Sequence, residues 1–227
     1  MLIVDDKWLL IGPNRHGSLW STRVLQAAFR TRPAAGDSPR HTPLCKIPEQ
    51  TRRGLTVVGI IRCPLRWYLS KWRIYWNTAI AKGLQPIPFC EFWEAHWLDP
   101  HGVCGKNTED MPLPRAEIGA WSYHHIAYHC LDAPAMLRSM SRAELAESYP
   151  SRLSADELMH TETLNMDIAR VFGPGVWQHF HKARNGSGSG QFLGLYTREM
   201  LRAVRERDGW LAGFYPQFCC HERFARC

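Results

Sequence analysis

The pattern of apolar and polar residues predicts short strands that alternate with helices. The apolar runs Leu2–Val4 and Trp8–Ile11 indicate an edge strand that turns into a buried strand. Between Ser18 and Phe29, apolar residues recur at the spacing of a helix. The uninterrupted run Leu55–Ile61 is rich in β-branched residues, which is typical of a strand covered on both faces. These elements, in this order, predict an α/β fold.

Weaker patterns predict the remaining elements. Helices are expected after Pro64 and over Phe89–Trp97, Ala143–Glu147, Glu162–Phe172 and Thr197–Phe214, and a short strand is expected near His41–Lys46. We therefore expect a single domain over residues 1–227, built as three layers with helices on both sides of a central, mostly parallel sheet. Ligands of such sheets bind beyond the carboxyl ends of the strands.

Composition narrows the class of protein without choosing a function. A chain of 227 residues with 45% hydrophobic and 22% charged residues is neither disordered nor fibrous. The net charge of +7 favours an anionic partner. Because the basic residues are dispersed and form no tail, they favour a folded pocket over a nucleic-acid-binding arm.

The sequence offers no membrane span and no targeting segment. No apolar run approaches the roughly 18 residues that a spanning helix needs, and the first residues lack the pattern of a signal peptide. We therefore expect a cytoplasmic protein. Its eight cysteines form no CxxC pair, so free thiols are expected.

The first candidate site is the segment Arg15–Trp20, between the second strand and the first helix. Backbone N–H groups at a helix start can bind an anion, Gly17 lets the backbone approach closely, and Ser18 adds a hydroxyl donor. The GxxxxGK[ST] pattern of nucleoside triphosphatases is absent from the sequence, which disfavours an ATP or GTP enzyme. An ordinary turn with a glycine at the bend is the alternative.

The second candidate site pairs Arg62 with Ser70. Arg62 ends the buried run Leu55–Ile61, and Ser70 follows it by eight residues, about two turns into the next helix. A guanidinium fork and a hydroxyl in this arrangement can hold a phosphate. A surface arginine and an unrelated helix serine are the alternative.

Together, the two segments resemble the donor-binding motifs of the sulfotransferases that use 3′-phosphoadenosine 5′-phosphosulfate (PAPS). That family's phosphosulfate loop commonly reads K-S-G-T-T-W, where this chain has Arg15-His16-Gly17-Ser18-Leu19-Trp20. The family's 3′-phosphate motif reads R-x-P with a serine eight residues after the arginine, where this chain has Arg62-Cys63-Pro64 and Ser70. Glu162-Thr163-Leu164 is similar to the family's E-x-L segment, and Tyr196 to Tyr215 resembles its closing helix. The family usually has lysine at Arg15, a small residue at His16, a hydroxyl at Leu19 and Asn or Asp at Cys63.

The resemblance implies a P-loop-like fold and a donor site without metal. PAPS would bind to Arg15, His16, Gly17, Ser18, Leu19, Trp20, Arg62 and Ser70, and adenosine 3′,5′-bisphosphate (PAP) would be the product. Arg184-Asn185-Gly186 stands where many relatives carry an R-K-G loop over the nucleotide. The sulfuryl group would move in line to a hydroxyl or amine acceptor.

The resemblance also implies two catalytic roles. Arg15 would stabilise the bridging oxygen of the donor. His41, chosen by its position before the Leu55–Ile61 strand, would be the base that takes the proton of the acceptor. A surface role for His41 is the alternative, in which case the base is expected among Glu91, Glu94, His96 and His101.

Other interpretations stay open from the sequence. A non-catalytic nucleotide-binding module would explain the altered loop, and a P-loop kinase is less favoured. His125 and His129 share the spacing of two zinc ligands, but no HExxH glutamate completes a metal site in the sequence. The acceptor (carbohydrate, lipid, peptide or small molecule) and the oligomeric state are left open.

Overall fold

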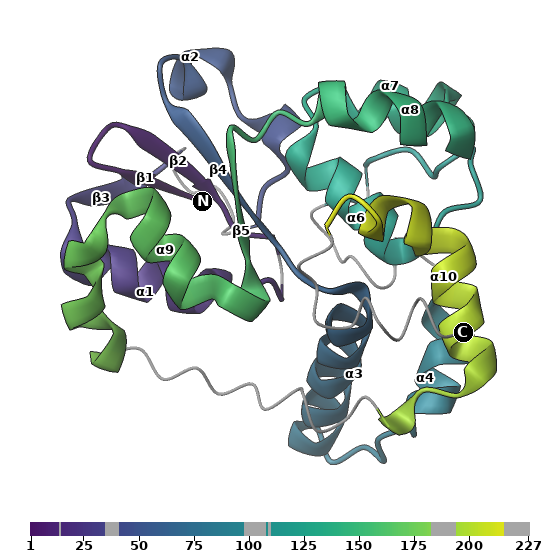
Figure 1. Cartoon of the computed structure of the whole chain (residues 1–227). Coiled ribbons are helices and arrows are strands. Elements are labelled where there is room, and N and C mark those ends of the chain that lie inside the picture. The colour runs from purple at the N-terminus through teal and green to yellow at the C-terminus, as the bar shows by residue number, and fades with distance from the viewer. Residues whose placement is uncertain (14, 35–40, 98–107, 109, 183–193, 216–227) are drawn as a thin grey trace.

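A five-stranded sheet organises the computed structural model, which describes residues 1–13, 15–34, 41–97, 108, 110–182 and 194–215 (Figure 1). The strands are β1 (Leu2–Val4), β2 (Trp8–Ile11), β3 (Thr31–Pro33), β4 (Thr56–Ile61) and β5 (Glu157–His160), in the spatial order β3-β1-β2-β4-β5. β2, β4 and β5 are parallel, and β1 pairs antiparallel with both β2 and β3. Every strand of this sheet except β1 thus points the same way, which confirms the expected α/β class and mostly parallel sheet.

The described helices are α1 (Ser18–Ala28), α2 (Glu49–Arg52), α3 (Pro64–Ala81), α4 (Phe89–His96), α6 (Ala120–His129), α7 (Ala133–Ser139), α8 (Arg142–Arg152), α9 (Leu164–Phe172) and α10 (Arg198–Ala212). Six of the described helices were predicted from the sequence, whereas α2, α6 and α7 were not. The 3-10 segments are η1 (Leu44–Lys46), η3 (Thr161–Thr163) and η4 (Pro174–Lys182). The predicted helix ends are correct to within a few residues, except that α8 extends well past its predicted end at Glu147.

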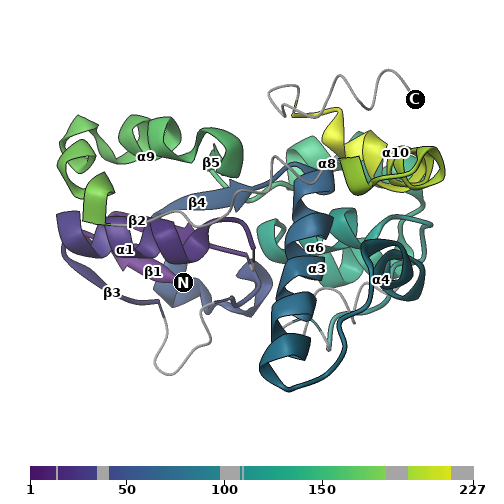
Figure 2. The ribbon, with the colours of Figure 1, turned by 90° about the horizontal axis from the view of Figure 1, so that it is seen from below.

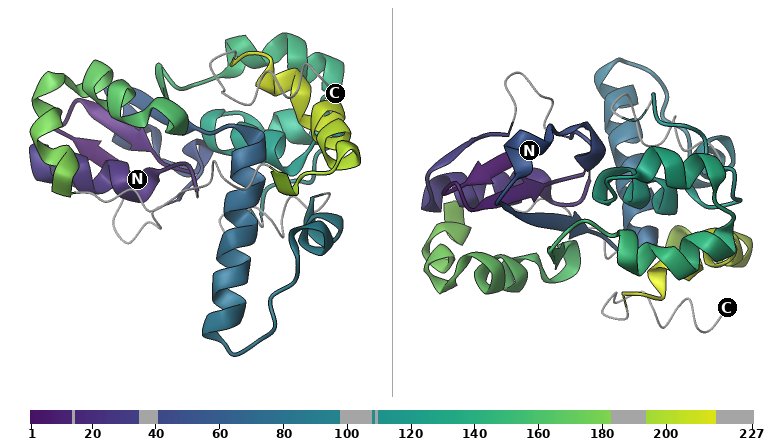
Figure 3. Two further views of the ribbon diagram at one scale, coloured as in Figure 1. Left: turned by 60° about the horizontal axis from the view of Figure 1, so that its bottom comes forward. Right: turned by 90° about the horizontal axis from the view of Figure 1, so that it is seen from above.

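Each face of the sheet buries its own hydrophobic core. Successive side chains of a strand point to opposite faces, so in β2 Leu9 and Ile11 enter one core and Leu10 enters the other. The Leu10 core is completed by α1 and α9, which lie along the same face of the sheet (Figure 1). The Leu9 core continues into a helical group that includes α3, α4, α6 and α10. Figures 2 and 3 show this group beyond the end of β4, where α3 begins.

A buried carboxylate ties the helical group together. Asp208 of α10 accepts hydrogen bonds from the Ser122 backbone N–H of α6 at 2.9 Å and from the Tyr68 hydroxyl of α3 at 2.8 Å. Burial raises the pKa of Asp208 to about 6, against the opposing effect of these hydrogen bonds. A Cβ at Gly119 would lie 2.2 Å from this carboxylate, so only glycine fits there. Asp208 therefore satisfies the amino terminus of α6 from a distant helix.

Two expectations about local structure are wrong. β1 is not an edge strand, because the chain returns after α1 and pairs β3 along its outer side. The segment near His41–Lys46 forms η1 in place of a strand. Its Leu44 is fully buried and η1 packs against α6, so tertiary packing decides the conformation here.

The expectation of free thiols is wrong for Cys63. Cys63 is disulfide-bonded, whereas Cys45, Cys90 and Cys130 are free. Disulfides are rare in cytoplasmic proteins, so this bond counts against the cytoplasmic location that we expected.

None of the described helices combines the length and the apolar character needed to cross a membrane.

We predict that Asp208→Ala lowers the free energy of unfolding by about 3 kcal/mol, because it leaves a buried N–H and a buried hydroxyl unpaired. Urea denaturation followed by circular dichroism measures this change. Asp110→Ala is the matched control, since it removes an exposed partner of Lys46 and should cost less than about 1 kcal/mol. Equal costs for the two variants would contradict the role given to Asp208.

Candidate anion-binding site

The turn between β2 and α1 depends on two glycines. A Cβ at Gly12 would lie 2.4 Å from the Cβ of Ser18, so the chain folds back tightly onto the start of α1. Gly17 is the residue before α1 and has φ 79°, and a Cβ there would lie 2.7 Å from Cδ2 of Leu164. Arg15 also has a positive φ of 73°, which a non-glycine residue seldom adopts. The turn is thus a tight, strained segment at the amino terminus of a helix.

The structure brings the two predicted segments together. Nε of Arg15 donates a hydrogen bond to Oγ of Ser70 at 2.9 Å. Nη1 of Arg62 donates to the backbone carbonyl of Arg15, also at 2.9 Å. This meeting follows from the topology, because β2 and β4 are adjacent parallel strands whose carboxyl ends share one edge of the sheet. Arg62 and Ser70 are both buried there.

Positive charge accumulates at this edge. Burial, together with the nearby cations Arg15, Arg66 and Arg73, lowers the pKa of Arg62 to about 10, whereas Glu162 opposes the shift. Burial and then Arg73 also lower the pKa of Arg15. Three partly buried guanidinium groups and one carboxylate thus act on the buried Arg62. Such a group of cations favours an anionic ligand.

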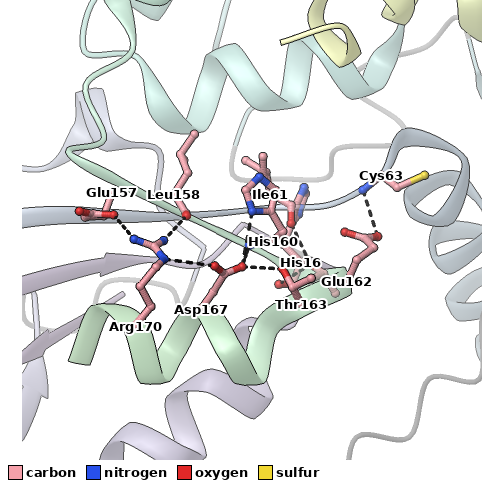
Figure 4. Close-up of polar contacts among 11 residues, drawn as sticks. His16, Ile61, Cys63, Glu157, Leu158, His160, Glu162, Thr163, Asp167 and Arg170 are labelled. Carbon is pink, nitrogen blue, oxygen red and sulfur yellow. Dashed lines mark hydrogen bonds and ion pairs between the residues drawn. The ribbon is translucent and has the colours of Figure 1, made fainter. Parts of the chain in front are cut away.

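The segment that follows β5 supports both halves of the site. Glu162 accepts a hydrogen bond from the Cys63 backbone N–H at 3.2 Å, at the start of α3 (Figure 4). Oγ1 of Thr161 lies 3.0 Å from the His16 carbonyl and 2.9 Å from the Ile61 carbonyl, to which it can donate. Leu164 lies directly against Gly17. The E-x-L segment therefore has a structural role, and sequence reasoning missed Thr161 because no local pattern marks its long-range contacts.

A polar network fixes α9 against β5. Asp167 accepts hydrogen bonds from the His160 backbone N–H at 2.9 Å and from the Thr163 hydroxyl at 2.7 Å (Figure 4). Although burial opposes the shift, these hydrogen bonds and the His160 ring hold the pKa of Asp167 well below its usual range. Arg170 adds a bond of 2.6 Å to Glu157. The network sets the position of α9 and hence of Leu164 beside the turn.

The residues predicted after Arg15 in the turn have different environments. His16 is fully buried and Trp20 is almost so, with the Trp20 ring 5.2 Å from that of Phe180. Ser18 begins α1. Leu19 is 48% exposed, so its side chain is not part of the buried site. Arg184, Asn185 and Gly186 lie outside the described residues.

His41 lies close to the turn. Its Nδ1 is 2.7 Å from the Gly12 carbonyl at the end of β2. A carbonyl only accepts, so Nδ1 carries the proton and the lone pair of the neutral ring is on Nε2. The Tyr128 hydroxyl donates to the His41 carbonyl at 2.8 Å and anchors the backbone. This arrangement is compatible with a base at His41.

The alternative bases have less support. Glu91 and Glu94 are exposed on α4. His96 packs against the rings of Phe92 and Tyr75. His101 lies outside the described residues.

His125 and His129 of α6 are buried and form contacts within the helical group. Nδ1 of His125 lies 3.1 Å from the Tyr149 hydroxyl, and Nδ1 of His129 lies 3.0 Å from the His125 carbonyl. Burial lowers the pKa of His129 to about 4 and holds that of His125 well below its usual value. Within the described ranges, no group of three His, Cys, Asp or Glu side chains is placed to hold a metal ion.

Comparison with protein-family models, with curated proteins and with solved structures finds no match for this chain. The resemblance to the sulfotransferases therefore stays a prediction that rests on the residues of the two segments.

We predict that Gly17→Ala lowers the free energy of unfolding by about 3 kcal/mol, because it adds a collision with Leu164 to the cost of a positive φ. Gly54→Ala measures the cost of the positive φ alone, since Gly54 has φ 75° and a Cβ added there would meet nothing within 4 Å. It should cost only about 1 kcal/mol. In a Leu164→Ala background, Gly17→Ala should cost no more than Gly54→Ala. If Gly17→Ala lowers the free energy of unfolding by the same amount with and without Leu164→Ala, the collision with Leu164 is unimportant.

Proposed function

We propose that the chain is a sulfotransferase that moves a sulfuryl group from PAPS to a hydroxyl or amine acceptor. The observation that carries the proposal is the meeting of Arg15, Arg62 and Ser70 at the carboxyl ends of two adjacent parallel strands. PAPS carries a 3′-phosphate and a 5′-phosphosulfate, and a group of cations at this edge suits both. The P-loop-like character of the fold belongs to the same proposal.

The two ends of the donor are assigned to the two segments. Arg62 and Ser70 bind the 3′-phosphate, and the turn from Arg15 to Trp20 holds the phosphosulfate against the first N–H groups of α1. Because Nε of Arg15 contacts Ser70, Arg15 links the two subsites. Its guanidinium is therefore within reach of charge at both ends, which extends the role that the resemblance implied.

The transfer requires stabilisation of the leaving phosphate and removal of one proton. The acceptor oxygen forms a bond to sulfur while the bond from sulfur to the bridging oxygen breaks, and PAP leaves. Arg15 and the α1 amides stabilise the charge on that bridging oxygen. Nε2 of His41 takes the acceptor proton, since Nδ1 already donates to Gly12.

Two experiments separate this function from the alternatives. Binding of PAP without Mg²⁺ favours a sulfotransferase or a non-catalytic module over a kinase. Release of PAP from labelled PAPS in the presence of pooled carbohydrate, lipid, peptide and phenol acceptors then separates the enzyme from the module. The proposal is wrong if PAP does not bind, and the module is favoured if PAP binds without turnover.

We predict that Arg62→Ala weakens PAP binding by tenfold or more, as the loss of a charge-assisted contact of about 1.5–3 kcal/mol requires. Calorimetric titration with PAP measures this. Arg53→Ala is the control, because Arg53 is exposed and paired with Glu49 away from the site. In the same titration, Arg15→Ala should also weaken PAP binding, and Arg15→Lys should restore part of it. Unchanged affinity in folded Arg62→Ala would remove the assignment.

We predict that His41→Ala lowers kcat by about 10²–10⁴-fold, the usual range for a general base, and leaves PAP affinity nearly unchanged. Turnover of PAPS with the acceptor found in the screen, together with calorimetry, gives both quantities. His96→Ala is the control, because it removes a histidine on α4 that is not the proposed base. An equal loss of affinity and kcat would make His41 a structural support of the Gly12 turn.

A further inference from the structure

His124 of α6 is a buried imidazole that the proposed transfer does not use. Its side chain is fully buried, and neither ring nitrogen has a hydrogen-bond partner among the described residues. A neutral imidazole carries one N–H, and leaving such a group unpaired in a protein interior normally costs stability. A buried polar group of this kind therefore calls for a role that apolar packing alone does not give.

His124 lies between the two parts of the proposed active site. Its ring stacks on that of His16, with centroids 5.2 Å apart and planes inclined by only 4°. Its ring is also 4.5 Å from that of Tyr128, whose hydroxyl holds the His41 carbonyl. One side chain thus touches the donor turn through His16 and the segment of the candidate base through Tyr128.

The charges around His124 favour a neutral ring. The groups that face it are His16 from the turn, Lys71 from α3, and His125 and His129 from α6. Burial and then Lys71 hold the pKa of His124 well below its usual value, and each of the three histidines adds to the shift. A protonated His124 would lose its solvation and would be repelled by the Lys71 ammonium group.

We propose that His124 is a positioning residue that, as a neutral imidazole, holds the Arg15–Gly17 turn and His41 in a fixed relation to each other. That the positioned residues bind PAPS rests on the proposed function, whereas the contact between His124 and the turn does not depend on it. The sign of the pH effect follows from proton linkage. The ordered site holds His124 as the neutral form, whereas the exposed histidine of the opened site takes up a proton below its ordinary pKa of 6.5. The contribution of His124 to the stability of the ordered site is therefore present above pH 6.5 and is lost as the pH falls below that value.

Hydrogen–deuterium exchange of the full chain tests the coupling without any ligand. The amides of residues 16–21 are compared at two pH values after correction for the intrinsic exchange rate. A single linked proton should reduce their protection about tenfold between about pH 7.5 and about pH 5.5. His124→Phe keeps a flat ring for stacking and cannot be protonated, so protection should change less than about twofold over the same range.

A second buried histidine provides the matched control. His129 is on the same helix and its ring lies against Gly59 of β4, away from the turn. His129→Gln should lower overall stability but retain the wild-type pH dependence at residues 16–21. The proposal is overturned if His124→Phe shows the wild-type pH dependence, or if His129→Gln loses it to the same extent.

Binding experiments separate this inference from the proposed function. Sulfate keeps its charge over the whole pH range, so a change in its affinity with pH reflects protonation of the protein and not of the probe. The affinity for PAP measures binding of the proposed nucleotide. His124→Ala should weaken both by about tenfold or more through loss of positioning, while His124→Phe restores the affinity at about pH 7.5. If wild-type protein binds neither probe, the proposed function fails and exchange alone decides the role of His124. If it binds both and His124→Ala binds equally well, the positioning role fails.

Discussion

The burial of the Arg62 guanidinium group at the carboxyl ends of β2 and β4 is the constraint on which the site depends. Arg62 is almost inaccessible to solvent and donates to the carbonyl of Arg15, so it cannot be removed without freeing the turn. Desolvation and neighbouring cations lower its pKa to about 10, and Glu162 compensates only in part. Among the residues that act on the pKa of Arg62, cations thus outnumber carboxylates, and a surplus of positive charge of this kind favours anions.

The second half of the chain supplies the scaffold for this charge. Glu162 holds the start of α3, Thr161 contacts the carbonyls at the ends of both segments, and Leu164 supports Gly17. Asp208 has the equivalent role in the helical group, because it satisfies the amino terminus of α6 from α10. Binding residues in the first third of the chain thus depend on residues that lie 99 to 145 positions further along the chain.

Aromatic side chains complete the surroundings of the cations. His16, His124 and Trp67 form a packed group beside the turn, and Nζ of Lys71 lies 5.0 Å from the Trp67 ring centroid. Aromatic faces accept a nearby cation without adding a compensating negative charge. The rings therefore pack beside the turn without adding a negative charge that would oppose the proposed anionic ligand.

The sequence by itself determined the two halves of the site and the elements beside them, β2, α1, β4 and α3, whereas it predicted neither β3 and β5 nor α2, α6 and α7. The apolar runs of β2 and β4 predicted buried strands, and the sequence placed Arg62 at the end of the second strand and Ser70 about two turns into the helix that follows. Only the tertiary structure decided that Arg15 contacts Ser70, that β3 covers β1, that Cys63 is disulfide-bonded and that His124 stacks on His16. The physical reason is range: periodicity records which face of an element is buried, whereas contacts between distant segments depend on how those faces meet.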